Sequence, residues 1–149
     1  MSATDFEFMR LALEQARLAA DMGETPVGAV AVWDGRPVSL AHNLRESGRC
    51  ALAHAELLAI RDACQQLGGW RLHRCTLYVT LEPCPMCAGA IINARIPRVV
   101  FGARDPKAGC FGSVADFAAL PFNHRPEVVS GVLEDECGAV IRDFFRALR

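Results

Sequence analysis

Two short motifs constrain the fold of this chain, because their side chains suit a single metal ion and must therefore meet in space. The first is His54-Ala55-Glu56, and the second, Pro83-Cys84-Pro85-Met86-Cys87, begins 27 residues after Glu56. One imidazole and two thiolates bind zinc well, and three protein ligands leave a fourth tetrahedral position open for water, as in catalytic sites. A nearby carboxylate that is not needed as a ligand can move protons. The pattern predicts a hydrolytic zinc enzyme with metal ligands His54, Cys84 and Cys87 and the catalytic residue Glu56.

Each motif taken alone has a more ordinary interpretation. A Cys-x-x-Cys pair can be two packed cysteines or a redox pair, and a His-x-Glu triplet is less specific still. The prediction therefore rests on both motifs together, each at the expected start of a helix. A closed structural zinc site would need a fourth ligand. Cys50 could supply one if the helix of His54 began earlier, although Gly48 and the polar residues before it favour a loop.

The composition is that of one globular domain spanning residues 1–149. Hydrophobic residues make up 52% of the chain and charged residues 22%, which allows a core that needs no metal to fold. No apolar run approaches the ~18 residues of a membrane span, and no signal-peptide pattern stands at the N-terminus. We therefore expect a cytoplasmic protein without a membrane partner.

Seven cysteines with irregular spacing argue against a disulfide framework. Outside the metal motif, the cysteines have no metal-binding spacing of their own. We expect all five to be small apolar core residues, namely Cys50, Cys64, Cys75, Cys110 and Cys137.

The charge distribution bears on nucleic-acid binding. A formal net charge of −1 argues against a broad surface that coats nucleic acid. Residues 95–107 are locally basic, with three arginines and Lys107 against the single acid Asp105. Such a segment is most often a solvated face, and a local RNA contact is the alternative.

Hydrophobic periodicity and turn residues predict alternating helices and strands. A Thr4-x-x-Glu7 capping box opens a first helix that Gly23 ends, and Asp34-Gly35 predicts a hairpin turn. We expect strands at 27–33, 37–41, 76–81, 98–102 and 127–132, and further helices at 54–67, 84–94, 114–119 and 134–148. Residues 43–53 and 103–112 are expected loops. The alternation after the hairpin predicts an α/β fold with parallel strand pairs and helices on both faces of the sheet.

Both metal motifs fall where a strand or loop gives way to a helix. Cys84 and Cys87 are three residues apart, so in a first helical turn they face the same way. Unpaired N–H groups at a helix N-terminus lower the pKa of thiols there. Glu56 is two residues from His54 and does not share its direction on a regular helix, so it should reach toward water and substrate.

Taken together, these residues resemble the cytidine/deoxycytidylate deaminase superfamily, in which a His-x-Glu and Pro-Cys-x-x-Cys signature binds the catalytic zinc. Within it, the chain closely resembles the bacterial tRNA-specific adenosine deaminases, the TadA family. The likeness runs nearly end to end. It includes Pro26-Val27-Gly28-Ala29, His42-Asn43, residues 76–91, residues 95–105, Asn123-His124-Arg125 and Phe144-Phe145.

The resemblance implies a three-layer α/β/α cytidine-deaminase-like fold with a five-stranded mixed sheet, one zinc ion per subunit and a homodimer. It also implies hydrolytic deamination of adenosine to inosine at the wobble position (34) of tRNA, with the anticodon stem-loop of an arginine tRNA as the partner. In this reaction Glu56 takes a proton from the zinc-activated water, passes it to adenine N1 and later protonates the departing amine.

The resemblance also assigns residues to the substrate. Ala55 and Cys84 would orient the site through their N–H groups, and the Pro83 carbonyl would accept from the amine. Val27 would pack on the flipped base and Asn43 would hydrogen-bond the purine edge, whereas the residue type alone favours a turn. Asp105 and Lys107 would contact the RNA backbone and ribose, Phe145 would stack, and Asn123 and His124 belong to an RNA-facing loop or cap a local turn.

Two departures and two further functions complete the sequence-based expectations. Ala51-Leu52 stands where the family often has Pro-Thr, and the chain lacks the longer basic tail of some members. The same chemistry would serve a deaminase of a free nucleobase or nucleoside, such as guanine or cytosine. A zinc-stapled RNA-binding module without activity is the third possibility, but it has no need of Glu56.

Overall fold

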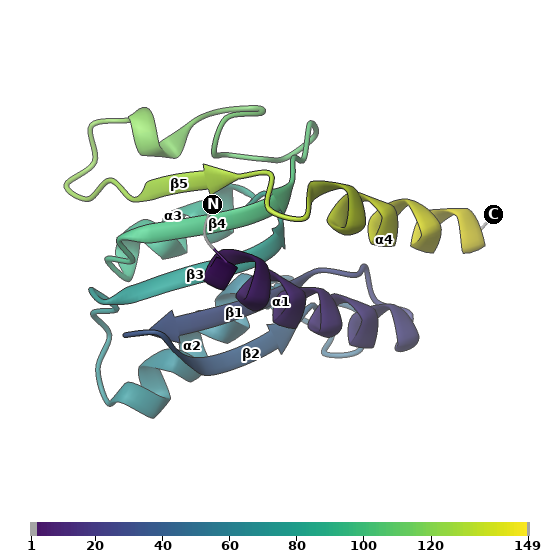
Figure 1. The fold of residues 1–149 in the computed structure, drawn as a ribbon, viewed down its shortest axis with the longest axis horizontal. Helices are drawn as coiled ribbons and strands as arrows, with labels where there is room; N and C mark the ends of the chain where they lie inside the picture. Colours follow the sequence, from purple (N-terminus) through teal and green to yellow (C-terminus); the bar gives the residue numbers. More distant parts are fainter. Residues whose placement is uncertain (1–2, 149) are drawn as a thin grey trace.

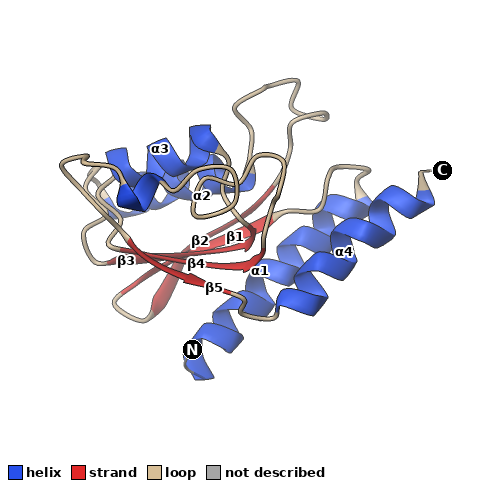
Figure 2. Ribbon diagram, turned by 90° about the horizontal axis from the view of Figure 1, so that it is seen from above, coloured by secondary structure: helices blue, strands red, loops and turns tan. Residues whose placement is uncertain are grey.

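The computed structural model describes residues 3–148 and has three layers. A five-stranded sheet in the order β2-β1-β3-β4-β5 forms the middle layer. Two helices, α2 and α3, cover one face of the sheet, and α1 and α4 lie on the other (Figure 2). The expected three-layer fold with a mixed sheet is confirmed. Along the chain, the elements are α1 (Ala3–Asp21), β1 (Gly28–Trp33), β2 (Arg36–His42), α2 (Ala55–Leu67), β3 (Cys75–Leu81), α3 (Pro85–Asn93), β4 (Arg98–Ala103), the 3-10 helix η1 (Phe117–Ala119), β5 (Glu127–Ser130) and α4 (Glu134–Ala147).

The first helix and the hairpin follow their sequence signals with one exception. β1 and β2 pair antiparallel, and the turn residues Asp34 and Gly35 have φ values of 49° and 80°, as in a type I′ turn. α1 buries its apolar stripe, including Met9 and Leu13, against the sheet. The predicted capping box is wrong, because the helix already includes Ala3 and so Thr4 lies within its first turn.

The second half of the sheet is parallel. β3 pairs antiparallel with β1 but parallel with β4, which in turn pairs parallel with β5. α3 supplies the crossover from β3 to β4, since a parallel pair cannot be joined by a tight turn. The chain therefore leaves the carboxyl end of β3 and enters α3 within three residues, Glu82 to Cys84.

Apolar side chains of alternating strand positions fill two separate cores. Leu77, Phe101 and Ile91 belong to the core under α2 and α3. Tyr78 and Val100, the neighbours of those strand residues, belong to the core under α1 and α4. This division follows from the period of two in a β-strand, and it explains why the central strands are apolar on both faces.

Several details differ from the sequence-based expectations. The helix expected at 114–119 is reduced to η1, because the N–H groups of Val114 and Phe117 bond to the carbonyls of Gly109 and Cys110 instead. β5 ends at Ser130, since the chain turns at Gly131 toward α4. Cys50 is exposed, so its expected burial in the core is wrong.

The other cysteines outside the metal motif agree better with their expected burial. Cys64 is half-buried beside the core, whereas Cys75, Cys110 and Cys137 are buried. Within residues 3–148, no helix combines the length and apolar character needed to cross a membrane.

Candidate active site

Two helix N-termini on the same face of the sheet carry the proposed metal ligands. His54 is the N-cap residue of α2 and Cys84 is the N-cap residue of α3, both with extended backbone. Pro85 occupies the first turn of α3, where its missing N–H has no helical partner to lose. Cys87 lies in the same turn, so its sulfur faces the site from the buried side.

The three side chains converge with the spacing that zinc requires. His54 Nδ1 lies 3.6 Å from the Sγ atom of Cys84 and 3.6 Å from that of Cys87. A tetrahedral zinc ion, at about 2.3 Å from sulfur and about 2.0 Å from nitrogen, holds these atoms about 3.5 Å apart. Of the groups in residues 3–148 that could hold a metal ion, this is the one set of three, and Cys50 is outside it. The donor set therefore fits a zinc ion with an open fourth position.

The electrostatics of the ligands also suit a cation. Hydrogen bonding from the Cys87 thiol and from His54 lowers the pKa of Cys84 to about 4, so this sulfur is a thiolate at neutral pH. The adjacent thiolate and burial raise the pKa of Cys87. Interaction with Cys84 raises the pKa of His54 as well. Two adjacent thiolates repel each other. A divalent cation would remove this repulsion, because zinc binds both sulfurs as thiolates and displaces their protons.

Glu56 lies in the first turn of α2 and lines the same cavity as His54 and Cys84. Its side chain is only 4% exposed, and this burial raises the pKa of its carboxyl to about 7. A carboxyl that titrates near neutral pH can both accept and donate a proton. The position of Glu56 is therefore suited to the role of proton carrier.

A cavity of about 230 Å³ opens beside the ligands. This volume is below the range of roughly 300–1,000 Å³ for drug-sized ligands, which suits a single nucleobase. The cavity is lined by Thr25, Val27, Asn43, Arg45, His54, Ala55, Glu56, Leu81, Glu82, Cys84, Asp105 and Ala108. Four residues that sequence reasoning assigned to the substrate are among them, namely Val27, Asn43, Ala55 and Asp105.

Asn43 combines a turn with a position in the cavity wall. Its Nδ2 donates to the carbonyl of Thr25 at 3.2 Å, and its Oδ1 accepts from the Arg45 N–H at 3.2 Å. The second bond is the local turn that Asn favours by itself. These bonds fix the amide at the cavity wall. The donor and acceptor capacity of the amide that they do not use is available to a ligand.

The loop after β4 carries two of the other assigned residues. Asp105 Oδ1 accepts from the N–H groups of Lys107 and Ala108, at 3.0 and 3.3 Å, and so folds the loop around itself. Lys107 is exposed and does not line the cavity. Pro83 is buried, and its carbonyl accepts from the Cys110 N–H at 2.8 Å.

Residues near the C-terminus lie away from the cavity lining. Phe145, 45% exposed, packs against Phe144 on α4, a helix that runs out beyond the sheet (Figure 1). Asn123 is exposed. His124 Nε2 lies 2.6 Å from the carbonyl oxygen of Ile96, which is distant along the chain, so this contact is not the cap of a local turn.

Sequence reasoning missed two buried carboxylates that hold the cavity walls. Glu82 accepts from three N–H groups of the loop after β4, and Glu24 accepts from the Glu46 and Ser47 N–H groups, at 3.0 and 2.6 Å, in the loop after β2. Both carboxylates are almost wholly buried. The signal that could have found Glu82 was its place directly before Pro83-Cys84, at the end of a buried strand.

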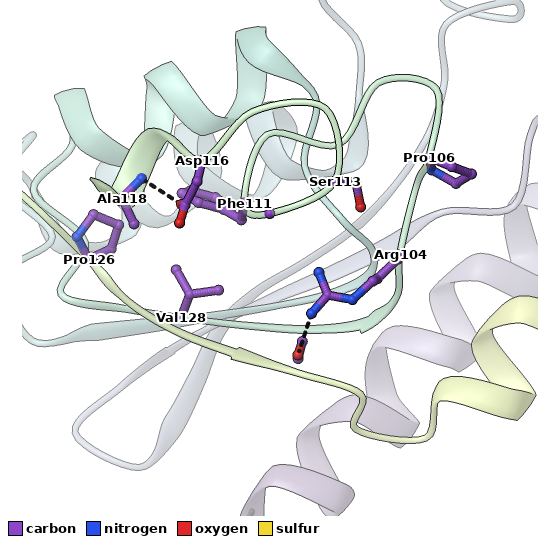
Figure 3. Close-up of a pocket in the computed structure, with 10 residues that line it drawn as sticks. Arg104, Pro106, Phe111, Ser113, Asp116, Ala118, Pro126 and Val128 are labelled. Carbon is purple, nitrogen blue, oxygen red and sulfur yellow. Dashed lines mark hydrogen bonds between the residues drawn. The ribbon is translucent and has the colours of Figure 1, made fainter. Parts of the chain in front are cut away.

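A second hollow of about 670 Å³ lies on the other side of the loop after β4 (Figure 3). Arg104 extends along it and donates to Ser130 Oγ at 3.3 Å, while Asp116 accepts from the Ala118 N–H at 3.1 Å. Arg104 and Asp105 are consecutive, yet they line different cavities. The loop after β4 is therefore a thin wall between the two.

Known proteins are similar to this chain in sequence and in fold. The family described as MafB19-like deaminase matches residues 3–149. The tRNA-specific adenosine deaminase of Bacillus subtilis (strain 168) is 54% identical over 143 residues, which cover 95% of this chain and 89% of that protein. A solved structure from a study of A-to-I editing by tRNA:A34 deaminases at the wobble position of transfer RNA has a TM-score of 0.88 and 47% identity, covering 90% of this chain and 98% of that one. A guanine deaminase from Nitrosomonas europaea has a TM-score of 0.78 and 26% identity, covering 93% and 83%.

Proposed function

Because this chain belongs to the tRNA-specific adenosine deaminases within the MafB19-like deaminases, we propose that it converts adenosine to inosine at wobble position 34 of tRNA. The proposal takes residues 1–149 as one deaminase domain. The observation that carries the chemistry is the meeting of three zinc-compatible ligands with one buried, protonatable carboxyl in a cavity the size of a base. The relatives supply the choice of adenosine in tRNA.

In this proposal His54, Cys84 and Cys87 hold one zinc ion per subunit. When bound, zinc supplies Lewis-acid activation of the attacking water. Glu56 takes one proton from the attacking water and delivers it to N1 of the adenine, while the water oxygen bonds to C6. Glu56 then takes the proton of the new C6 hydroxyl and gives it to the amino group, so that the C6–N bond breaks and ammonia leaves. The Ala55 and Cys84 N–H groups orient the reacting atoms, and the carbonyl of Pro83 accepts from the amine.

The remaining assigned residues bind the substrate. Val27 packs on the base, and Asn43 reads the purine edge with its amide. A base must leave its stack to reach such a buried carboxyl, so the walls of the cavity hold a flipped nucleotide. Asp105 and Lys107 contact the anticodon-loop ribose and backbone, and Phe145 supplies a stacking surface.

Three finer features belong to the same proposal. The substrate is the anticodon stem-loop of an arginine tRNA, the protein is a homodimer, and it works in the cytoplasm. The tRNA and the dimer follow from the family resemblance of the sequence, and the cytoplasmic location is the expectation drawn from the sequence pattern itself. Light scattering of the purified chain would test the dimer, and inosine mapping in total tRNA would identify the tRNA.

Deamination of a free base is the alternative with an observation behind it, namely the shared fold of the guanine deaminase. The deciding experiment incubates the zinc-loaded protein with a tRNA transcript, free adenosine, cytidine and guanine, and measures ammonia and inosine. We expect ammonia from the transcript alone and its loss on treatment with a zinc chelator. Turnover of a free base without inosine in the transcript would favour the alternative.

A further inference from the structure

The strand that leads to the metal ligands ends in a buried carboxylate with an unusual set of partners. Glu82 follows β3 directly, precedes Cys84 by two residues and is 2% exposed. Its two oxygens accept from the N–H groups of Asp105, Phe111 and Ser113, at 3.1, 3.0 and 3.1 Å, and from the Ser113 hydroxyl. All these donors belong to the loop after β4.

This carboxylate is satisfied without a cation. The ion pairs among residues 3–148 do not include Glu82. A buried charge is costly unless hydrogen bonds replace its water, and hydrogen bonds to an ionised acceptor are among the stronger ones. The Glu82 carboxylate therefore depends on the loop, because the loop N–H groups replace the water that this buried charge would otherwise bind.

Three further contacts bring the end of β4 and the loop after it against the metal-binding turn. A Cβ atom at Gly109 would overlap the Glu82 carboxylate, so the loop passes it at a distance that a side chain would prevent. The Cys110 N–H donates to the carbonyl of Pro83, and the Glu82 N–H donates to that of Ala103, both at 2.8 Å. Glu82 thus joins the segment that bears Asp105 to the segment that bears Cys84.

We propose that Glu82 is a positioning residue for the substrate, which sets the loop of Asp105 and Lys107 at a fixed distance from the metal ligands. The proposal rests on the proposed function, because it concerns the binding of the RNA at the same site. Glu82 acts through Asp105, whose N–H it holds. Loss of the carboxylate should therefore weaken the binding of the RNA more than it slows the chemical step.

The test compares three variants. Glu82→Gln replaces one of the two acceptor oxygens by an NH2 group, which donates and faces the donors of the loop. Ser113→Ala removes only the hydroxyl donor, and Asp5→Asn is the matched control. Asp5 is another buried carboxylate, 1% exposed, paired with Arg98 at 2.8 Å, and it does not line the cavity. For each variant, zinc content, melting temperature, Kd for a fluorescent anticodon stem-loop, and kcat and KM for inosine formation are measured.

For Glu82→Gln we expect kcat/KM to fall about 10- to 100-fold, the cost of a misplaced substrate contact, mostly through KM and Kd, with zinc retained. Ser113→Ala should also lower kcat/KM through KM and Kd, but by a smaller factor. Asp5→Asn should lower the melting temperature and leave kcat/KM within about twofold.

Equal kinetic constants for Glu82→Gln and Asp5→Asn would overturn the proposal, as would a loss explained wholly by missing zinc. If Glu82→Gln does not fold, Ser113→Ala decides alone, and unchanged KM and Kd in that variant would overturn it. Failure of the wild-type chain to form inosine would count against the proposed function instead, while the Kd values would still test the loop.

Discussion

Gly28 passes so close to Ala12 that a Cβ atom at Gly28 would overlap the carbonyl oxygen of Ala12. This contact joins the backbone of β1 to the backbone of α1, with no side chain between them. Gly28 also donates its N–H to Thr80 Oγ1 at 3.1 Å, and it follows Val27 in the cavity wall. The close approach therefore sets the position of one wall of the cavity.

Gly28→Ala should destabilise the protein by about 1–3 kcal/mol, because the obstacle is backbone and cannot rotate away. Urea unfolding of the variant and the wild type measures the change in the free energy of unfolding. Gly89→Ala is the control, since nothing lies within 4 Å of an added Cβ there. A wild-type midpoint for Gly28→Ala would show that α1 can move without cost.

Glu56→Gln should keep zinc and fold but lower kcat by about 10²- to 10⁴-fold, the usual contribution of a general acid–base group. The amide has nearly the same shape and cannot carry the proton. Single-turnover inosine formation on an anticodon stem-loop, with zinc measured in the same sample, gives the answer. Activity near that of the wild type would contradict the assigned role.

Glu24 should make stability depend on acid pH. Burial opposes its ionisation, but the Ser47 hydroxyl and the N–H groups of Ser47 and Glu46 outweigh burial and lower its pKa. Its stabilising contribution is therefore complete above the ordinary glutamate pKa of about 4.5 and is lost as the pH falls through the lowered value. Urea unfolding from pH 7 to pH 3 should show a smaller loss of stability for Glu24→Gln than for the wild type. Parallel pH curves would exclude this contribution.

Lys107 is the one lysine among the 149 residues. It is exposed and lies outside the cavity lining, two residues after Asp105, which belongs to that lining. Lys107→Ala should weaken anticodon stem-loop binding and reduce the slope of log Kd against log salt by about 1, since one phosphate contact is lost. Arg74→Ala is a fitting control, because Arg74 precedes β3 at the end away from the metal ligands. An unchanged salt slope for Lys107→Ala would remove Lys107 from the RNA contacts.

Sequence patterns predicted the layers of the fold and the convergence of His54, Cys84 and Cys87, because the signals for both are local. The Asp34-Gly35 turn, the apolar strands and the starts of α2 and α3 each have a signal within a few residues. No such local signal exists for the exposure of Cys50 or for the reduction of the helix expected at 114–119 to η1, since both depend on how the loops pack. The hydrogen bonds of Glu24 and Glu82 to the loop N–H groups were missed for the same reason, because these partners lie 22 to 31 residues away along the chain.

The thin wall after β4 has a consequence for how such an enzyme can change its substrate. The helix starts that bear His54 and Cys84 are fixed by the sheet and its core. The loop that bears Asp105 meets them through hydrogen bonds to the Glu82 side chain and one bond from the Cys110 N–H to the Pro83 carbonyl. The other residues of the segment 104–113 could thus be substituted together, provided that Glu82, Gly109 and Ser113 are kept to hold the loop in place. The reaction would then stay the same while the molecule that undergoes it changes, which makes this segment the natural target for redirecting the activity.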